Sequence, residues 1–306
     1  MRRAQIIALF GPTGVGKTEV AIELARRLRV LGERPVAVSA DALQVYQGLE
    51  TLTGAANARE RAELDHRLIS LLPVDARFSV GEYAELAHAE IDALLQAGER
   101  PIVVGGTGLY LRAALTELSL RPPPAEGVRE RWLTELELRG PGALHAILRD
   151  RAPWAALEIE PGDRQRIVRA LERLDAGELD PPEGESELWT DAVRHSTLLI
   201  GLVMERASLY ARIDARVDAM LAAGADAEVR RANAAGASIT ARKALGFEEL
   251  LGGDVEAMKR RTRNYARRQL TWMRKLAGVE VIDITARTPA QVAERALALW
   301  LTARSD

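Results

Sequence analysis

The sequence predicts an α/β fold, in which a P-loop type parallel sheet is flanked by helices and carries an inserted helical domain. Short apolar runs at residues 6–10, 35–41 and 101–104 alternate with helical patterns at residues 19–31 and 79–97. This alternation is typical of parallel strands joined by crossover helices. After a charged, helical middle part and an acidic loop at residues 177–190, the strand pattern returns at residues 196–203. We therefore expect a core of residues 1–118 and 196–306, interrupted by a helical insertion at residues 119–195.

The first connection of the predicted sheet carries the pattern G-x-x-x-x-G-K-T. It follows the apolar run directly and precedes the first helical pattern, which is the context that a phosphate-binding loop needs. The glycines let backbone N–H groups approach an anion closely, and the helix directs its positive N-terminal end to the same point. Its members, expected to bind phosphate groups, are Gly11, Pro12, Thr13, Gly14, Val15, Gly16, Lys17 and Thr18, with the Thr18 hydroxyl as a candidate magnesium ligand.

Composition excludes several classes of protein. The 306 residues carry a net charge of −2, so no global charge indicates nucleic acid, and any basic surface must be local. The chain lacks cysteine, which excludes disulfides and thiolate zinc sites, and its four histidines show no metal-ligand spacing. The apolar runs are too short to span a membrane. We expect a soluble, monomeric protein of the cytoplasm.

Two further strand ends carry candidate site residues. Asp41 ends the second predicted strand, where ligands of open α/β sheets gather, although an aspartate in a turn or helix cap is an equally good interpretation. The next strand runs into a glycine-rich turn that contains Thr107 and lacks the acid of a Walker B motif. This turn is either only a tight strand–helix connection, or it also places Thr107 so that its hydroxyl orients the substrate.

Basic side chains gather on three predicted helices. Arg212 and Arg216 lie one turn apart and suit a diphosphate, but surface pairing with Asp214, Asp218 or Glu205 is the stronger interpretation from sequence alone. Residues 163–169 are basic at one helix end, as solvated faces often are. Residues 259–275 hold eight basic residues and no acid, with aromatic residues between them, which favours a polyanion such as RNA over a solvated face.

Taken together, these motifs resemble the bacterial tRNA dimethylallyltransferase (isopentenyltransferase) family over nearly the whole chain. The matching segments are residues 11–18, 41–46, 66–68, 104–110, 163–172, 212–221, 243–247 and 262–274. The resemblance implies magnesium-dependent transfer of a dimethylallyl group from dimethylallyl diphosphate to the exocyclic amine of the tRNA adenosine directly 3′ of the anticodon. The tRNA partner would be engaged through its anticodon stem-loop.

The resemblance also implies roles for individual residues. Asp41 would be the general base and Thr107 its orienting partner, while Arg212 and Arg216 would join the phosphate loop in holding the diphosphate. The residues that match tRNA-contacting segments are Asp41, Ala42, Leu43, Gln44, Thr107, Arg129, Gln165, Arg166, Arg169, Arg242, Lys243, Gly246, Phe247, Arg267, Arg268, Gln269, Trp272 and Arg274.

The sequence departs from the family pattern at two places. Ala42 replaces the usual serine, and residues 52–57 replace a Gly-Thr-Ala-Lys-Pro segment, which removes a lysine. Two other functions compete with prenyl transfer. A small-molecule P-loop kinase that uses ATP would share the loop and the sheet without needing the basic helix, and a non-enzymatic RNA-binding protein would need neither Asp41 nor Lys17.

Overall fold

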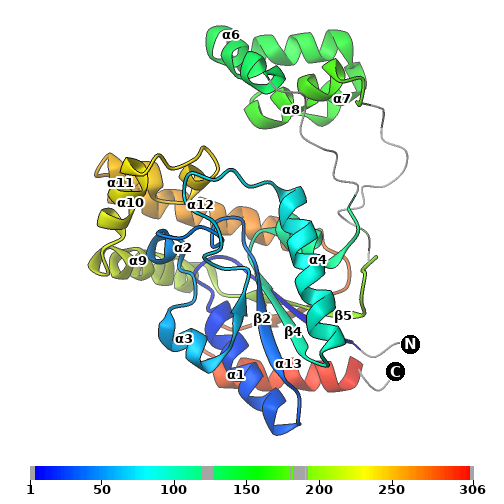
Figure 1. The fold of residues 1–306 in the computed structure, drawn as a ribbon, viewed down its shortest axis with the longest axis vertical. Helices are drawn as coiled ribbons and strands as arrows, with labels where there is room; N and C mark the ends of the chain where they lie inside the picture. Colours follow the sequence, from blue (N-terminus) through cyan, green and yellow to red (C-terminus); the bar gives the residue numbers. More distant parts are fainter. Residues whose placement is uncertain (1–3, 119–126, 180, 182–189, 191, 304–306) are drawn as a thin grey trace. The chain divides into compact units, whose positions relative to one another are not determined.

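The computed structural model describes residues 4–118, 127–179, 181, 190 and 192–303. Within these residues the chain forms a six-stranded parallel sheet in the order β3–β2–β4–β1–β5–β6 (Figure 1). The α/β fold that the sequence predicts is therefore confirmed. The strands are β1 (Ile6–Phe10), β2 (Pro35–Ala40), β3 (His66–Arg67), β4 (Arg100–Gly105), β5 (Thr197–Val203) and β6 (Val279–Asp283).

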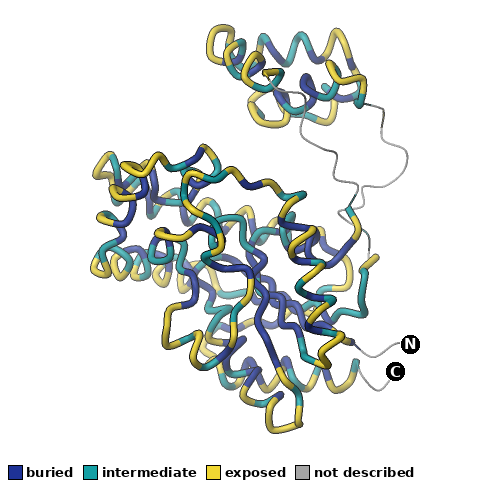
Figure 2. The backbone as a smooth tube through the Cα atoms, viewed as in Figure 1, coloured by how far each residue is buried: buried dark blue, intermediate teal, exposed yellow. Residues whose placement is uncertain are grey.

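Helices cover both faces of the sheet. The connection β1–α1–β2 runs towards one edge of the sheet and the connection β3–α4–β4 runs back, so right-handed crossovers place α1 (Lys17–Val30) and α4 (Val80–Gln96) on opposite faces. On the α1 face, Ile7 and Leu9 of β1 share a buried cluster with Leu24 of α1 and Trp300 of α13. Strands β1 and β2 are apolar and buried along their length because both faces of the sheet are covered there (Figure 2).

Local signals set the ends of the helices. Ser79 and Glu82 form a capping box at the start of α4: the Glu82 N–H donates to the Ser79 hydroxyl, and the Ser79 N–H donates to the Glu82 carboxylate. The other helices of the core are α2 (Glu50–Thr53), α3 (Ala58–Glu63), α5 (Gly108–Leu115), α9 (Arg206–Ala222), α10 (Ala225–Ala234), the 3₁₀ turn η2 (Ala241–Lys243), α11 (Phe247–Leu251), α12 (Val255–Met273) and α13 (Pro289–Ala303).

Two elements near the C-terminus lie beyond the patterns read from the sequence. Strand β6 adds an outer strand beside β5, and α13 packs on α1. The indole N–H of Trp300 in α13 donates to the Ala4 carbonyl at 3.1 Å, and the guanidinium of Arg100 lies over its ring. Helix α13 therefore packs against the segment that leads into β1.

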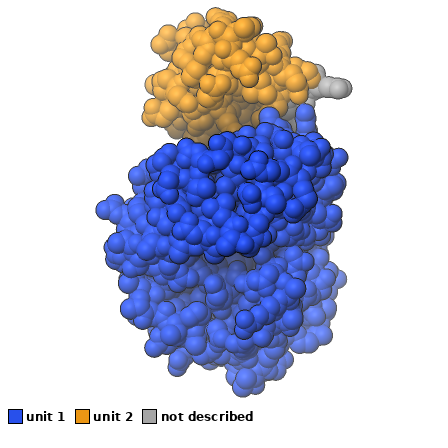
Figure 3. Space-filling model, turned by 90° about the vertical axis from the view of Figure 1, so that its left-hand side faces the viewer, with its two compact units in different colours: residues 1–119, 187–306 blue, residues 120–186 orange. Residues whose placement is uncertain are grey.

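The internal contacts of the chain divide it into two units, Met1–Ser119 with Glu187–Asp306, and Leu120–Ser186 (Figure 3). The smaller unit consists of α6 (Val128–Arg151), α7 (Pro153–Glu158) and α8 (Arg164–Asp175) around its own core, which includes Trp132, Leu144 and Leu171. Helix α6 is broken at Gly140, whose φ of 77° is not helical. Among the described helices, none is long and apolar enough to cross a membrane.

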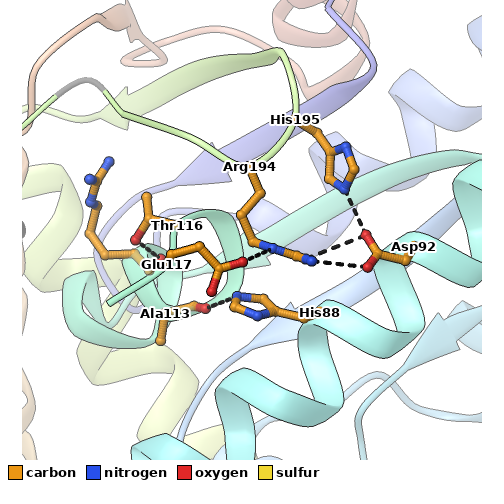
Figure 4. A network of polar contacts seen from close by, with 8 residues as sticks. His88, Asp92, Ala113, Thr116, Glu117, Arg194 and His195 are labelled. Atoms are coloured by element: carbon orange, nitrogen blue, oxygen red, sulfur yellow. Dashed lines mark hydrogen bonds and ion pairs between the residues drawn. The ribbon is translucent and has the colours of Figure 1, made fainter. Parts of the chain in front are cut away.

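A polar network joins α4 to the segment that leads into β5 (Figure 4). The Asp92 carboxylate accepts hydrogen bonds from the Arg194 guanidinium at 3.0 and 3.4 Å and lies 2.6 Å from Nε2 of His195. Arg194 also donates to Glu117 at 2.5 Å, and its N–H donates to the Leu115 carbonyl. The network therefore ties the end of α5 to the strand that re-enters the core.

Replacing Asp92 by asparagine is expected to lower the free energy of unfolding by about 1–3 kcal/mol, because charge-assisted hydrogen bonds are lost. Partial burial acts to raise the pKa of Asp92, but the hydrogen bonds from Arg194 and His195 outweigh it and hold the pKa below its ordinary value. The stabilisation is therefore fully present above the unfolded-state pKa of Asp92 and is lost as pH falls through the lower folded-state pKa. Urea denaturation of both proteins at neutral and at acidic pH checks this; a difference that grows on acidification would contradict it.

Candidate active site

The phosphate loop lies between the end of β1 and the start of α1. Helix α1 begins at Lys17, and Gly14 and Gly16 adopt positive φ angles of 80° and 99°, which a side chain would strain. The Lys17 ammonium turns back over the loop and donates to the carbonyls of Gly11 and Pro12 at 2.9 and 3.1 Å. The Lys17 ammonium therefore lies at the loop, next to the positive N-terminal end of α1. Together they form a site that can bind an anion.

A cavity of about 440 Å³ opens at this loop, at the carboxyl end of the sheet. It collects site residues from segments far apart in the sequence, including Asp41 after β2 and Thr107 after β4. The residues singled out from the sequence that line it are Thr13, Gly14, Gly16, Lys17, Thr18, Asp41, Ala42, Leu43, Gln44, Thr107, Arg212, Arg216, Lys243, Arg268 and Gln269.

Two cations are crowded together in this cavity. Burial and, to a smaller extent, the nearby Arg216 lower the pKa of Lys17 to about 8, while Asp41 and Glu19 act against the shift. Burial also lowers the pKa of Arg216. Half-buried cations whose charged forms are disfavoured gain stability when an anion binds between them. The electrostatics therefore favour an anionic ligand at the loop.

The acids that could have paired with Arg212 and Arg216 on the surface bind other partners. Asp214 accepts from Arg263 at 2.5 Å, and Asp218 lies 2.7 Å from the Lys259 ammonium. Among the residues that the structure describes, neither Arg212 nor Arg216 forms an ion pair. The Arg216 guanidinium instead lies against the backbone of Gly54, inside the segment that departs from the family pattern.

Asp41 and Thr107 are each held by one hydrogen bond. A carboxylate oxygen of Asp41 accepts the Leu43 N–H at 2.9 Å, as in the turn considered from the sequence. This contact leaves the second carboxylate oxygen available to the cavity. The Thr107 hydroxyl lies 2.7 Å from the Tyr265 hydroxyl of α12.

Several cavity residues were missed from the sequence. Tyr265 stood out only as an aromatic residue in a basic helix, and its pairing with Thr107 joins positions that are 158 residues apart. An apolar wall of Leu52, Met220 and Met258 lies beside Arg216. Such residues fit any hydrophobic core, so nothing in their local sequence marks them as lining a site.

Only part of the basic row on α12 is free of acidic partners. Lys259, Arg261 and Arg263 pair with acids of neighbouring elements, which the helix's own sequence could not reveal. In the described part of the chain, no carboxylate forms an ion pair with Arg267, Arg268 or Arg274. The second half of α12 therefore carries its uncompensated positive charge.

The remaining residues that match tRNA-contacting segments lie outside the cavity. Phe247 is fully buried beneath the guanidinium of Arg242, which is also paired with Glu248, and Gly246 lies against Met258. Gln269, which does line the cavity, is also buried, with 4% of its surface exposed. The side chains of Phe247 and Gln269 are thus both buried.

Four candidate tRNA contacts lie in the smaller unit. Arg129 and Arg169 both pair with the buried carboxylate of Glu172, at 3.6 and 3.3 Å, and Arg166 pairs with Asp163 at 3.5 Å. Gln165 is exposed in the first turn of α8. These ion pairs hold the three arginine side chains in fixed positions on the surface of the smaller unit.

Comparison with known proteins gives a consistent result. Residues 44–276 match the family model described as IPP transferase. The chain is 38% identical to the tRNA dimethylallyltransferase of Symbiobacterium thermophilum, over 92% of this chain and 89% of the relative, and 40% identical to that of Streptomyces coelicolor, over 89% and 88%. It is similar to the solved full-length tRNA isopentenylpyrophosphate transferase from Bacillus halodurans, with 31% identity, a TM-score of 0.70, and coverage of 99% of this chain and 98% of that one. The chain belongs to the IPP transferase family.

Proposed function

We propose that this protein transfers the dimethylallyl group of dimethylallyl diphosphate to the exocyclic N6 amine of the tRNA adenosine directly 3′ of the anticodon. One observation carries the proposal. A single cavity brings together an anion site at Lys17 and Arg216, a carboxylate at Asp41 and a hydroxyl at Thr107. The curated relatives and the solved structure reported above are all named as tRNA prenyl transferases, which supports the same chemistry.

The proposed reaction uses each of these groups. The adenine amine attacks C1 of the dimethylallyl group, the C1–O bond to the diphosphate breaks, and the amine proton passes to the Asp41 carboxylate. Lys17 and Arg216 stabilise the charge that develops on the leaving diphosphate. Thr107 orients the acceptor amine. The target base must leave its stack to reach the enclosed cavity, as in other enzymes that act on a base.

The residues of the site fit a magnesium ion that is bound mainly through the substrate. In the part of the chain that the structure describes, no three acidic or histidine side chains form a cage for a metal. Mg²⁺ commonly takes one or two protein oxygens together with phosphate oxygens and water. The Thr18 hydroxyl at the start of α1 lines the cavity and would hold such an ion. When bound, magnesium would neutralise charge on the diphosphate.

The exposed basic half of α12 is proposed to contact the tRNA backbone, together with Arg129, Gln165, Arg166 and Arg169 of the smaller unit. Replacing Arg267 and Arg268 by alanine should weaken tRNA binding and reduce the slope of log affinity against log salt by about 2. Filter binding at several salt concentrations measures this slope. Lys259→Ala is the matched control, because Asp218 already neutralises this lysine, and it should leave the slope unchanged. An unaltered slope in the double variant would make the basic half of α12 a solvated surface.

The proposed reaction is tested by incubating the protein with magnesium, unmodified tRNA and dimethylallyl diphosphate that is labelled in its prenyl group. A parallel reaction contains labelled ATP and candidate small acceptors. Transfer of label from the prenyl diphosphate to tRNA is the expected result. Consumption of ATP without prenyl transfer would instead support the kinase, and tRNA binding without either reaction would support a non-enzymatic RNA-binding protein. As a tRNA-modifying enzyme, the protein is proposed to act as a monomer in the cytoplasm.

A further inference from the structure

One face of α12 lies against the two loops that form the active site. Gln269 accepts a hydrogen bond from the Thr13 N–H of the phosphate loop at 2.9 Å and donates one to the Gly106 carbonyl after β4 at 2.7 Å. One partner is a donor and the other an acceptor, so only one orientation of the amide satisfies both. Because the side chain is 4% exposed, water cannot readily replace either bond. This single amide therefore fixes the phosphate loop relative to the turn that carries Thr107.

The same turn is pressed against α12 through its glycines. A Cβ atom on Gly106 would lie 2.4 Å from the Gln269 amide nitrogen, and one on Gly108 would lie 2.2 Å from the Trp272 ring. Both distances are too short for a side chain, so the glycines permit a direct contact between backbone and helix. Gln269 and Trp272 of α12 thus leave no room for a side chain at these two positions of the turn.

One helical turn before Gln269, Tyr265 completes this face. Its hydroxyl lies 2.7 Å from the Thr107 hydroxyl, and Arg268 lies over its ring. Burial raises the pKa of Tyr265 to about 12, and either of the two hydroxyls could be the donor in this hydrogen bond. A hydrogen bond accepted from Tyr265 would leave the hydrogen of Thr107 directed elsewhere in the cavity.

We propose that Gln269 and Tyr265 are positioning residues: Gln269 sets the phosphate loop in register with the β4–α5 turn, and Tyr265 sets the hydroxyl of Thr107. They hold the diphosphate half and the acceptor half of the cavity at a fixed separation. The Tyr265 part rests on the proposed prenyl transfer, whereas the Gln269 part concerns the anion site itself. The outer face of α12 would meet RNA, and its inner face would align the groups that react.

Gln269 is tested with Gln269→Met, which keeps the length of the side chain and removes both hydrogen bonds. Titration with inorganic diphosphate and magnesium should show affinity reduced about tenfold, as the loss of one buried hydrogen bond implies. Single-turnover prenyl transfer should slow by about 100-fold because the reacting groups are misplaced. The affinity for tRNA and its salt slope should not change. Lower tRNA affinity with unchanged diphosphate affinity would overturn the proposal and make Gln269 an RNA contact.

Two further variants distinguish loss of the positioning role of Gln269 from general unfolding of α12. Gln269→Asn keeps an amide that is too short to reach both partners, so it should give an intermediate loss of diphosphate affinity even if the methionine variant does not fold. Glu256→Gln removes an exposed carboxylate in the first turn of α12. It should leave the diphosphate affinity, the rate of prenyl transfer and the tRNA affinity unchanged. Full diphosphate affinity in the asparagine variant would show that the bridge is not needed.

Tyr265 is tested by Tyr265→Phe alone and in a Thr107→Ala background. The single variant should slow transfer about tenfold without altering diphosphate or tRNA affinity, and it should cause little further loss when Thr107 is absent. Equal slowing in both backgrounds would overturn its action through Thr107. If the unaltered protein transfers no prenyl group, the proposed function and the Tyr265 part fail together. The diphosphate titration would still decide the role of Gln269.

Discussion

Asp41→Ala is expected to lower the rate of prenyl transfer by a factor on the order of 10²–10⁴, the usual contribution of a positioned general base. The adenine amine is a poor nucleophile until its proton is accepted. Asp41 lines the cavity, and the Leu43 N–H donates to one of its carboxylate oxygens, which restrains the side chain there. Single-turnover transfer with saturating substrates measures the loss.

The control for this prediction is the affinity for tRNA. Asp41→Asn preserves the shape of the side chain and the hydrogen bond to Leu43, but it removes the basic oxygen. Both variants should bind tRNA nearly as tightly as the unaltered protein. If binding falls as much as the rate, Asp41 contributes to RNA recognition rather than to proton transfer.

Lys17→Ala should weaken diphosphate binding by about 30-fold or more, because it removes the half-buried cation at the phosphate loop. The structure also implies a pH dependence. Burial lowers the pKa of Lys17 to about 8, and the protonated form is the one that binds an anion. Diphosphate affinity should therefore be highest below pH 8 and decline as pH rises above it. Above pH 8, Lys17 should take up a proton when diphosphate binds.

Calorimetric titration with diphosphate in two buffers of different ionisation enthalpy measures this proton uptake. Lys17→Arg retains a positive charge throughout the range, so its affinity should be nearly independent of pH in the same interval. A protein whose diphosphate affinity stays constant through pH 8 would show that Lys17 does not hold the diphosphate.

The elements whose chemistry is local could be predicted from the sequence. The phosphate loop depends on glycine conformations and on a helix that begins at Lys17, and all of these follow from a run of eight residues. The break in α6 at Gly140 and the capping box at Ser79 are equally local. The parallel sheet followed from alternating strand and helix patterns, and the resemblance of the motifs identified the family.

Contacts between distant segments could not be predicted in this way. The basic residues of α12 looked uncompensated because the acids that neutralise Lys259, Arg261 and Arg263 lie on α9 and α11. The match to RNA-contacting segments likewise gave no sign that Gln269 is buried between two loops. Strand β6 and helix α13 are short or only moderately apolar. What identifies them is packing beside β5 and against α1.

The central claim is that this cavity directs a prenyl group to one particular amine. The most direct measurement is to react the protein with dimethylallyl diphosphate and unmodified tRNA, digest the tRNA, and identify the modified nucleoside and its position by mass spectrometry. The parallel substrate is the same tRNA with guanosine in place of the adenosine directly 3′ of the anticodon. We expect one dimethylallyl group on N6 of that adenosine and no product with the guanosine substrate. A prenyl group at another position, or on both substrates, would contradict the account.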